Sequence, residues 1–412
     1  MIAVNSMPHA PGSSASGLPG SCGCPDFSMT RRRLLATAAA TTGVMAGATL
    51  FGDSLRQVAY GAPGGNIVVV LSLRGGADGL SIVVPKGADH DVLTQLRPQV
   101  AIPQDRLIGG DANFGLHPAL APLLPMWQAG TFGAVHGVGL PQPNRSHFEA
   151  MAQIEDADPS SLERRGWINR LVGLNPAALP EQHMALGTAM VPLELAGPAP
   201  VLAVDSVTNL TLPNLWADRS LSSAVTRSWR GGGAYNEAVR QAVGATGRLK
   251  TLANSDPSAI ATVTYPDGPL HDVLINTAAL LKAEVGARVV TIDYGDWDMH
   301  TGMGTVDDGW MKDHLTHLAE SLKAFFDDLG PIASRLTLFT ISEFGRRVEA
   351  NGDAGTDHGY GNAMLVMGAG VSGGKVSGSW RHLDNLNEGD VSLAQDYRSV
   401  IWEVLSRRFP EI

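Results

Sequence analysis

The chain has 412 residues, 44% of them hydrophobic, and a formal net charge of −10. This length and hydrophobic content are enough to bury a large core, so we expect a globular protein with one large domain or one domain plus an insert. The acidic balance argues against a nucleic-acid-binding protein, because a negative surface repels a polyanion at long range.

The N-terminal segment has the features of an export signal. Three arginines, Arg31–Arg33, precede an uncharged run from Leu34 to Phe51 that is rich in Ala, Gly and Thr. This pattern is typical of a twin-arginine signal. We expect residues 1–61 to engage the twin-arginine translocase, and residues 62–412 to form a domain that is periplasmic or secreted. The run is too weakly apolar to favour the alternative, a retained anchor, so no stable membrane anchor is expected.

The start of the chain supports this division. Met29 opens a segment of ordinary signal length, so translation can begin there instead of at Met1. Both cysteines, Cys22 and Cys24, precede the arginines, and the mature chain therefore contains none. Residues 1–61 hold four arginines and two aspartates, a net charge of +2, and their removal changes the total from −10 to −12.

The mature part alternates strand-like and helix-like stretches, which predicts an α/β fold with a mostly parallel sheet. The first strand, residues 66–73 (NIVVVLSL), is a continuous β-branched run of the kind that is buried on both faces. Further strands are expected at residues 132–138, 288–293, 335–342 and 363–367. Helices are expected at about 119–128, 146–156, 237–252, 270–284, 309–329 and 394–408. Residues 177–266 are less regular, and we interpret them as an insert or cap beside the sheet.

Polar groups follow the predicted strands, where ligands bind in sheets of this kind. The first strand leads into Arg74-Gly75-Gly76-Ala77-Asp78-Gly79, either a bare glycine turn or a turn that presents a charged pair. The second position is Asn144-Arg145-Ser146-His147-Phe148-Glu149. There Ser146 is expected at a helix N-cap, either as a plain capping residue with Glu149 or also as a nucleophile with Arg145 beside it for an oxyanion.

Two later strand ends combine carboxylates with histidines. Asp298 and His300 are two residues apart and could bind one metal from a single loop, since oxygen and nitrogen donors together suit Zn²⁺ or Mn²⁺; the alternative is an aspartate-rich turn that bonds its own backbone. Glu343 follows another strand, and a glycine-rich loop then presents Asp357 and His358, which could be only a hydrogen-bonded pair. Because a parallel sheet brings its strand ends to one side, we expect a metal site there.

At these residues the chain resembles an exported bacterial family called domain of unknown function 1501. The motifs that carry the resemblance are, in order, RGGADGL, NRSHFEA, GWINR, DMHTG, SEFGRR and GTDHG, and the resemblance spans about Asn66 to the C-terminus. That family is grouped with the alkaline phosphatase and sulfatase-like superfamily. The resemblance therefore implies an alkaline phosphatase-like three-layer sandwich with a metal site at the strand ends.

The resemblance also implies roles for single residues. It makes Ser146 the nucleophile, with Arg145 available for the anion, and it makes metal ligands of Asp78, Asp298, His300, Glu343 and His358. Asp298, His300 and His358 would form one site, and Asp78, Ser146 and Glu343 the other. The superfamily commonly has an Asp-His pair where this chain has Glu343-Phe344, so the second site lacks an imidazole.

These observations lead to one preferred hypothesis and two rivals. The preferred one is an exported metal-dependent hydrolase of small-molecule or glycan phosphate or sulfate esters, with Zn or Mn as its metal. The first rival is a catalytically degenerate scaffold that serves as an envelope binding or assembly protein. The second is a metal-free serine hydrolase that uses Ser146 with His147 or His358, which is disfavoured because the G-x-S-x-G elbow is absent.

Overall fold

A computed structural model describes residues 65–158, 165–210 and 219–410. The proposed signal region lies outside these residues. The described part is built on a sheet of nine strands, in which eight follow the order β12-β4-β11-β8-β1-β7-β5-β6 and β13 pairs with β4. Its strands are β1 (Ile67–Leu73), β4 (Phe132–Gly139), β5 (His183–Leu186), β6 (Leu202–Val204), β7 (Val289–Tyr294), β8 (Leu336–Ile341), β11 (Asn362–Gly368), β12 (Val376–Ser377) and β13 (Gln395–Asp396).

The sheet is mostly parallel, as the sequence predicts. Strand β1 runs parallel to both of its neighbours, β7 and β8, and the pairs of β5 with β6 and β7 are parallel too. Only β11 runs against its neighbours, β4 and β8. Two small antiparallel sheets lie apart from the main one: β2 (Val83–Pro85) with β3 (Phe114–Leu116), and β9 (Arg346–Ala350) with β10 (Thr356–His358).

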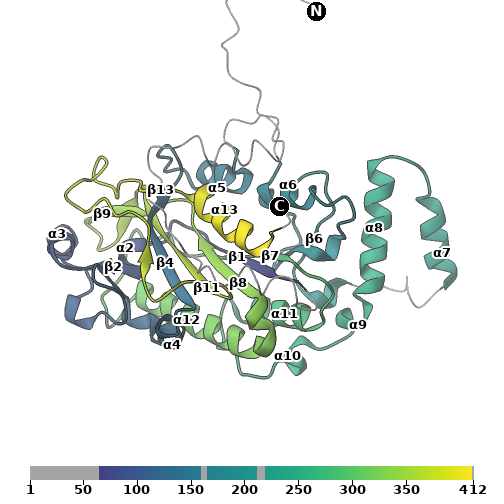
Figure 1. Cartoon of the computed structure of the whole chain (residues 1–412), viewed down its shortest axis with the longest axis horizontal. Helices are drawn as coiled ribbons and strands as arrows, with labels where there is room; N and C mark the ends of the chain where they lie inside the picture. Colours follow the sequence, from purple (N-terminus) through teal and green to yellow (C-terminus); the bar gives the residue numbers. More distant parts are fainter. Residues whose placement is uncertain (1–64, 159–164, 211–218, 411–412) are drawn as a thin grey trace, which may run out of the picture. The chain divides into compact units, whose positions relative to one another are not determined.

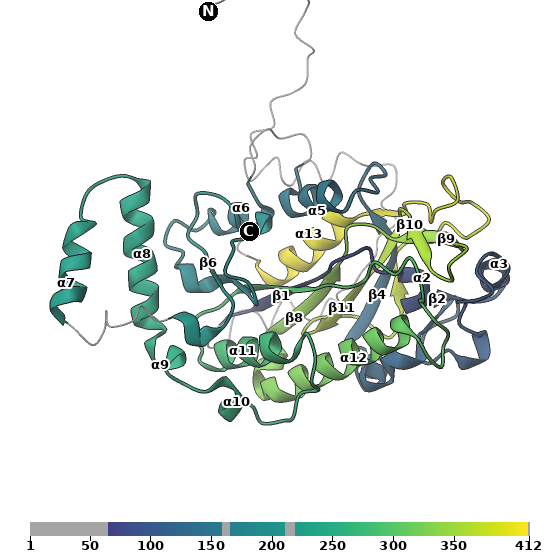
Figure 2. The same cartoon turned by 180° about the vertical axis from the view of Figure 1, so that it is seen from behind.

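Helices cover both faces of the sheet, which gives three layers (Figures 1 and 2). One face carries α5 (His147–Asp156), α6 (Trp167–Val172) and α13 (Tyr397–Arg408). The opposite face carries α4 (Leu124–Gln128), α10 (Pro257–Ile260), α11 (His271–Lys282) and α12 (Trp310–Leu329). The α/β sandwich predicted from the sequence is confirmed at this level. The shorter helices α2 (Gly79–Ile82) and α3 (Ala88–Leu96) lie near the small β2–β3 sheet.

Strand β1 does not alternate apolar and polar residues, because both of its faces are buried. Side chains alternate along a strand, so Val69 and Leu71 pack into the core that includes α11 and α12, whereas Val68 and Val70 pack into the core that includes α5, α6 and α13. Each such side chain stabilises the fold by roughly 1.5–3 kcal/mol when it is buried. The central strand is therefore held from both faces.

The directions of the strands bring distant segments to one edge of the sheet. Strands β1, β7 and β8 are parallel, so their carboxyl ends meet there. Strand β11 is antiparallel to β8 and to β4, and so its beginning and the end of β4 lie at the same edge. The loops after β4, β7 and β8, and the segment before β11, are thus neighbours although more than 200 residues separate the first from the last.

The range 177–266, expected to be an insert or cap, contains two strands of the main sheet, β5 and β6. It continues through α7 (Arg219–Ser228), α8 (Ala234–Arg248) and α9 (Lys250–Ala253), which lie beyond the β6 edge in Figure 1. Within the described residues, no helix is both long enough and apolar enough to cross a membrane.

Candidate metal centre

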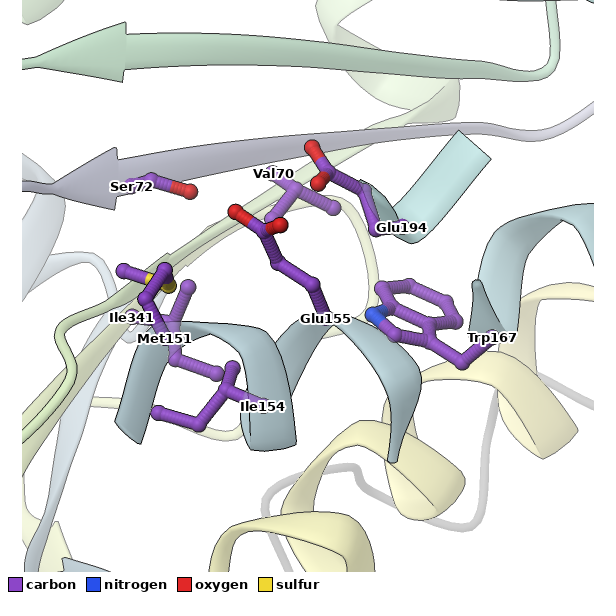
Figure 3. Close-up of a pocket in the computed structure, with 8 residues that line it drawn as sticks. All are labelled: Val70, Ser72, Met151, Ile154, Glu155, Trp167, Glu194 and Ile341. Carbon is purple, nitrogen blue, oxygen red and sulfur yellow. The ribbon is translucent and has the colours of Figure 1, made fainter. Parts of the chain in front are cut away.

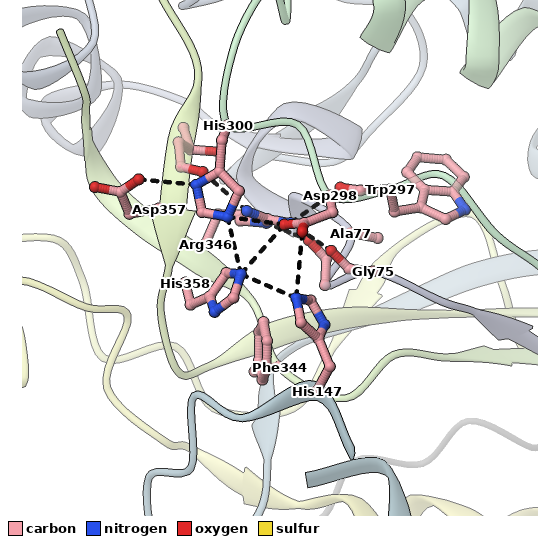
Figure 4. A network of polar contacts seen from close by, with 12 residues as sticks. Gly75, Ala77, His147, Trp297, Asp298, His300, Phe344, Arg346, Asp357 and His358 are labelled. Carbon is pink, nitrogen blue, oxygen red and sulfur yellow. Dashed lines mark hydrogen bonds and ion pairs between the residues drawn. The ribbon is translucent and has the colours of Figure 1, made fainter. Parts of the chain in front are cut away.

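Three side chains converge at this edge of the sheet: His147, Asp298 and His358 (Figure 4). The Nε2 atoms of His147 and His358 are 3.0 Å apart. The Asp298 carboxylate lies between them, with Oδ1 3.2 Å from His358 Nε2 and Oδ2 3.4 Å from His147 Nε2. The cluster joins the start of α5, the loop after β7 and the end of β10.

A third imidazole, His300, extends the cluster. Its Nε2 is 2.9 Å from His358 Nε2 and 2.9 Å from Asp298 Oδ1. Together, His147, Asp298, His300 and His358 present three ring nitrogens and one carboxylate around a common point.

The outer nitrogen of each imidazole is fixed by an acceptor. His358 Nδ1 donates to the backbone carbonyl oxygen of Arg145 at 2.9 Å, His147 Nδ1 to Glu343 Oε1 at 2.8 Å, and His300 Nδ1 to Asp357 Oδ1 at 2.9 Å. A carbonyl or carboxylate oxygen can only accept, so in the neutral ring the proton is on Nδ1 and the lone pair is on Nε2. Metal-binding histidines are oriented in this way by their outer partners.

This arrangement fits a divalent metal ion. Lone pairs of neutral imidazoles repel one another at 3.0 Å unless a cation lies between them, and the carboxylate adds negative charge at the same point. Ligands at about 2.0–2.1 Å from a tetrahedral Zn²⁺ are roughly 3.3 Å apart, and the separations within the cluster are 3.0, 3.2 and 3.4 Å. The described residues therefore contain a possible His/Asp site for a divalent metal.

Arg346 holds the carboxylate of the cluster in place. Its fully buried guanidinium donates to Asp298 Oδ1 at 2.6 Å and to the backbone oxygens of Gly75, Gly76, Trp297 and Thr356. Burial by itself raises the pKa of Asp298, but the hydrogen bond and the charge of Arg346 outweigh it and keep that pKa below its ordinary value. Burial also lowers the pKa of His358. An ionised carboxylate and a neutral imidazole are the forms that bind metal.

Phe344, which directly follows Glu343 in the sequence, is buried and packs against the imidazoles of the cluster. Its ring centroid is 4.9 Å from that of His147 and 4.7 Å from that of His358. An aromatic ring here offers no ligand, but it packs against both rings and restricts their orientation.

The structure brings together three of the five residues that the sequence suggested as ligands: Asp298, His300 and His358. Glu343 also lies at the site, but behind His147, where its Oε1 accepts from the Gly75 N–H and from His147 and its Oε2 accepts from the Ser342 hydroxyl. Asp78 lies in a buried ion pair with Arg97 and accepts a hydrogen bond from Ser81. Glu343 and the Oδ2 atom of Asp78 are thus engaged with other partners, while Asp78 Oδ1 is buried without a hydrogen-bond partner among the described residues.

The predicted catalytic pair is also at this edge. Ser146 is the N-cap residue of α5 and is exposed, and its side chain makes no capping hydrogen bond, so the expected capping role is not what the side chain does here. Arg145 contributes its backbone carbonyl to His358, while its guanidinium pairs with the buried carboxylate of Asp390. That guanidinium is therefore not free to bind an anion in the described conformation.

Sequence reasoning missed His147 as a ligand and considered it only as a base for Ser146. The signal was present, since His147 follows the expected cap residue in the segment that comes after the predicted strand 132–138. A histidine at the first position of a helix cannot be assigned to the sheet edge until the direction of β4 relative to β8 is known.

Residues 275–395 match a family described as "Protein of unknown function (DUF1501)". This range contains the DMHTG, SEFGRR and GTDHG motifs, while RGGADGL, NRSHFEA and GWINR lie outside it. Among curated proteins, no match was found.

Two solved structures show a weak likeness to the chain. The structure of the PH0037 protein from Pyrococcus horikoshii has 12% sequence identity and a TM-score of 0.30, and the alignment covers 84% of this chain and 97% of that one. The structure of the alkaline phosphatase from the Antarctic bacterium TAB5 has 11% identity and a TM-score of 0.27, with coverages of 74% and 92%. At these scores neither likeness supports an argument about activity.

Proposed function

We propose that this protein is a metal-dependent hydrolase whose cation is held by His147, Asp298 and His358, with His300 as a further donor. The observation that carries the proposal is the orientation of the imidazoles: each outer nitrogen is tied to an acceptor, so the inner nitrogens face one another and the Asp298 carboxylate. The donor set of nitrogens and one carboxylate favours Zn²⁺ or Mn²⁺. The second metal position expected from the resemblance is not part of the proposal, because Asp78 and Glu343 have other partners.

A divalent cation in such a site polarises an ester oxygen and lowers the pKa of a coordinated hydroxyl or water. The chain's own groups would orient the metal ligands and bind the substrate. Arg346 keeps Asp298 ionised and oriented, and Glu343 and Asp357 hold His147 and His300 with their inner nitrogens free of protons. Ser146 offers an exposed hydroxyl next to His147 at the N-terminus of α5, where free N–H groups favour a substrate anion. We infer that the substrate is a small-molecule or glycan phosphate or sulfate ester.

We further infer that the protein acts in the periplasm or outside the cell after passage through the twin-arginine translocase. The support is the arginine-rich segment before residue 34 and the weakly apolar run after it. This route carries folded proteins, which suits a metal loaded before export.

The proposal is tested on protein purified from the periplasm. Metal content is measured by mass spectrometry, and turnover is measured with p-nitrophenyl phosphate and p-nitrophenyl sulfate. We expect about one Zn or Mn per chain and turnover that is lost in both Ser146→Ala and His147→Ala. His271→Ala, which alters a histidine on α11, serves as the control and should retain both properties.

The outcomes separate the hypotheses. Bound metal without turnover of either ester favours the binding or assembly protein over the hydrolase. The absence of bound metal in the wild type overturns the metal-dependent mechanism. Labelling of Ser146 by a fluorophosphonate in the presence of a chelator favours the metal-free serine hydrolase instead.

A further inference from the structure

A second group of charged residues lies away from the metal cluster, around a small, partly open cavity between α5, α6 and the sheet (Figure 3). The cavity has a volume of about 10 Å³ for the centre of a water molecule, which is room for about one water. Its polar lining comes from Ser72, Glu155 and Glu194, and Trp167 closes one side. The carboxyl groups of Glu155 and Glu194 lie next to each other in this view.

Both carboxyl groups are buried. Glu194 is 3% exposed and Glu155 is 9% exposed, and their carboxyl groups lie side by side in Figure 3. Two adjacent carboxyl groups can hydrogen-bond to each other only when one of them carries a proton, because ionised carboxylates can only accept. The Oε2 atom of Glu194 has no hydrogen-bond partner, so it is available to a water in the cavity.

The surrounding charges cannot neutralise two ionised carboxylates. Arg74, in the loop after β1, is the cation that faces the pair, and it is shared between Glu155, at 2.6 Å, and Asp293 at the end of β7, at 2.9 Å. Asp293 is exposed and hydrated, but it draws on the same guanidinium as the two buried carboxylates. These therefore keep an excess of at least one negative charge, and burying such a charge without a partner is costly. One proton on the pair reduces the excess. Consistent with this, burial raises the pKa of Glu155, and burial together with the charge of Glu155 raises that of Glu194 to about 8.

The pair adds a polar contact between α5 and the short 3-10 helix η5 (Leu193–Leu195), which also pack together through Met151, Ile154 and Leu195. Glu155 is in the last turn of α5, and Glu194 is in η5. The η5 segment in turn holds the start of α6: the Gly166 N–H donates to the Ala196 carbonyl at 2.9 Å, and a Cβ on Gly166 would lie 2.0 Å from the Leu193 carbonyl oxygen. Movement of η5 would therefore disturb α6, including Trp167.

We propose that Glu155 and Glu194 share one proton at neutral pH and form a pH-sensitive latch that holds η5 and the start of α6 against α5. When the proton leaves, the two carboxylates repel each other inside the cavity. The segment with Glu194 then moves outward to hydrate its charge, because Arg74 is already divided between two partners. The latch involves none of the residues of the metal cluster and acts whether or not the protein is a hydrolase.

The full-length mature protein tests this directly. The infrared C=O band of a protonated carboxyl group should be present in the wild type at pH 7, disappear on titration to pH 9, and be absent in Glu194→Gln. Over the same pH range, hydrogen exchange should show a loss of protection of at least about tenfold in residues 166–172 and 193–196 of the wild type. In Glu194→Gln the side-chain amide can donate to Glu155 but cannot ionise, so these residues should stay protected at pH 9. Glu149→Gln, an exposed change on the same helix, should behave as the wild type does.

Two results would overturn the latch. One is a wild type that keeps full protection of these segments at pH 9. The other is a loss of protection in Glu194→Gln that equals the wild-type loss. If Glu194→Gln fails to fold, Glu155→Gln replaces it, since it also removes one charge of the pair and predicts the same protection.

Discussion

Glu343 lies behind His147, and both of its carboxylate oxygens are already used by hydrogen bonds. To bind a metal through Oε1, it would have to give up the Gly75 N–H or His147, both of which lie 2.8 Å away. Its Oε2 lies 3.1 Å from the Ser342 hydroxyl, which also donates to the Leu73 carbonyl oxygen at 2.7 Å. Its physical effect on the cluster is therefore indirect: its negative charge makes the His147 imidazole a better donor and keeps the proton on Nδ1.

This placement predicts the effect of Glu343→Gln. The amide keeps the shape of the side chain and can still accept from the Gly75 N–H, but it removes the charge beside His147. We expect the affinity for Zn²⁺, measured by isothermal titration calorimetry on the chelator-treated protein, to fall by about tenfold. The exposed neighbour Glu349 on β9 provides the control, and Glu349→Gln should leave the affinity unchanged. Equal affinities in all three proteins would show that the carboxylate has no part in the site.

Single residues were the hardest level to predict from the sequence. Asp298, His300 and His358 could be expected at one edge of the sheet because each follows a recognisable strand or glycine-rich loop. Glu343 satisfies the same criterion, and the sequence cannot distinguish a carboxylate that faces a metal from one that faces the back of a histidine. Asp78 also follows a strand, but Arg97, which binds it, lies in a different segment that carries no motif.

At the level of elements, the loop between β9 and β10 fixes the position of His300. The Gly355 backbone lies so close to this residue that a Cβ there would be 2.2 Å from the carbonyl carbon and oxygen of His300. The Asn351 side chain ties the same loop to His300 and to Asp357, donating to the carbonyl oxygen at 2.8 Å and to Oδ1 at 3.0 Å. The loop and the segment after β7 can approach in this way only because residue 355 has no side chain.

Gly355→Ala should therefore destabilise the fold and displace His300. Inserting a methyl group into a packed contact costs about 1–3 kcal/mol of the free energy of unfolding, which urea denaturation measures. Gly352→Ala is a matched control three residues away, because a Cβ at that position meets nothing within 4 Å. If the two variants have the same free energy of unfolding, the close approach of the loop to His300 is not a constraint in solution.

Elements with a strong pattern were predictable, whereas short ones were not. The five predicted strands correspond to β1, β4, β7, β8 and β11, which are the strands that bury continuous apolar runs. Strands β5 and β6 have four and three residues, and β6 is only partly buried, so no local period identifies them. They are strands because β7 offers an unpaired edge to β5, and β5 then offers one to β6. That cause is tertiary and is absent from local sequence.

At the level of the whole molecule, the cluster connects segments that are far apart along the chain. His147 comes from the start of α5, Asp298 from the loop after β7 and His358 from β10. The unfolded chain does not hold these donors together, so a cation that binds only the folded state adds its binding free energy to the stability of the fold.

We therefore expect Zn²⁺ to raise the free energy of unfolding. At a free concentration of 100 times its dissociation constant the gain is about 2.7 kcal/mol, which urea denaturation with and without chelator measures. In a His147→Ala, His358→Ala double variant the gain should disappear. His271→Ala should retain it. A gain of the same size in the double variant would assign the bound cation to some other part of the protein.

The buried carboxyl pair adds a dependence of global stability on pH. In the folded state the pKa of Glu194 is raised to about 8 by burial and by the charge of Glu155, against an ordinary value of 4.5. Below pH 4.5 both the folded and the unfolded states bind this proton, so its full stabilisation is present. Between pH 4.5 and about 8 only the folded state retains the proton, so stability falls as the pH rises. The loss for one proton is about 1.4 kcal/mol per pH unit.

Glu194→Gln separates this contribution from all other titrating groups. We expect the free energy of unfolding of the wild type, measured in urea at pH 6, 7 and 8, to fall relative to that of the variant by about 1.4 kcal/mol per unit, and the difference to level off above pH 8. The curve of Glu149→Gln should run parallel to that of the wild type. Parallel curves for the wild type and Glu194→Gln would mean that Glu194 is already ionised in the fold at pH 6, and that the cavity beside it admits enough water to hydrate the charge.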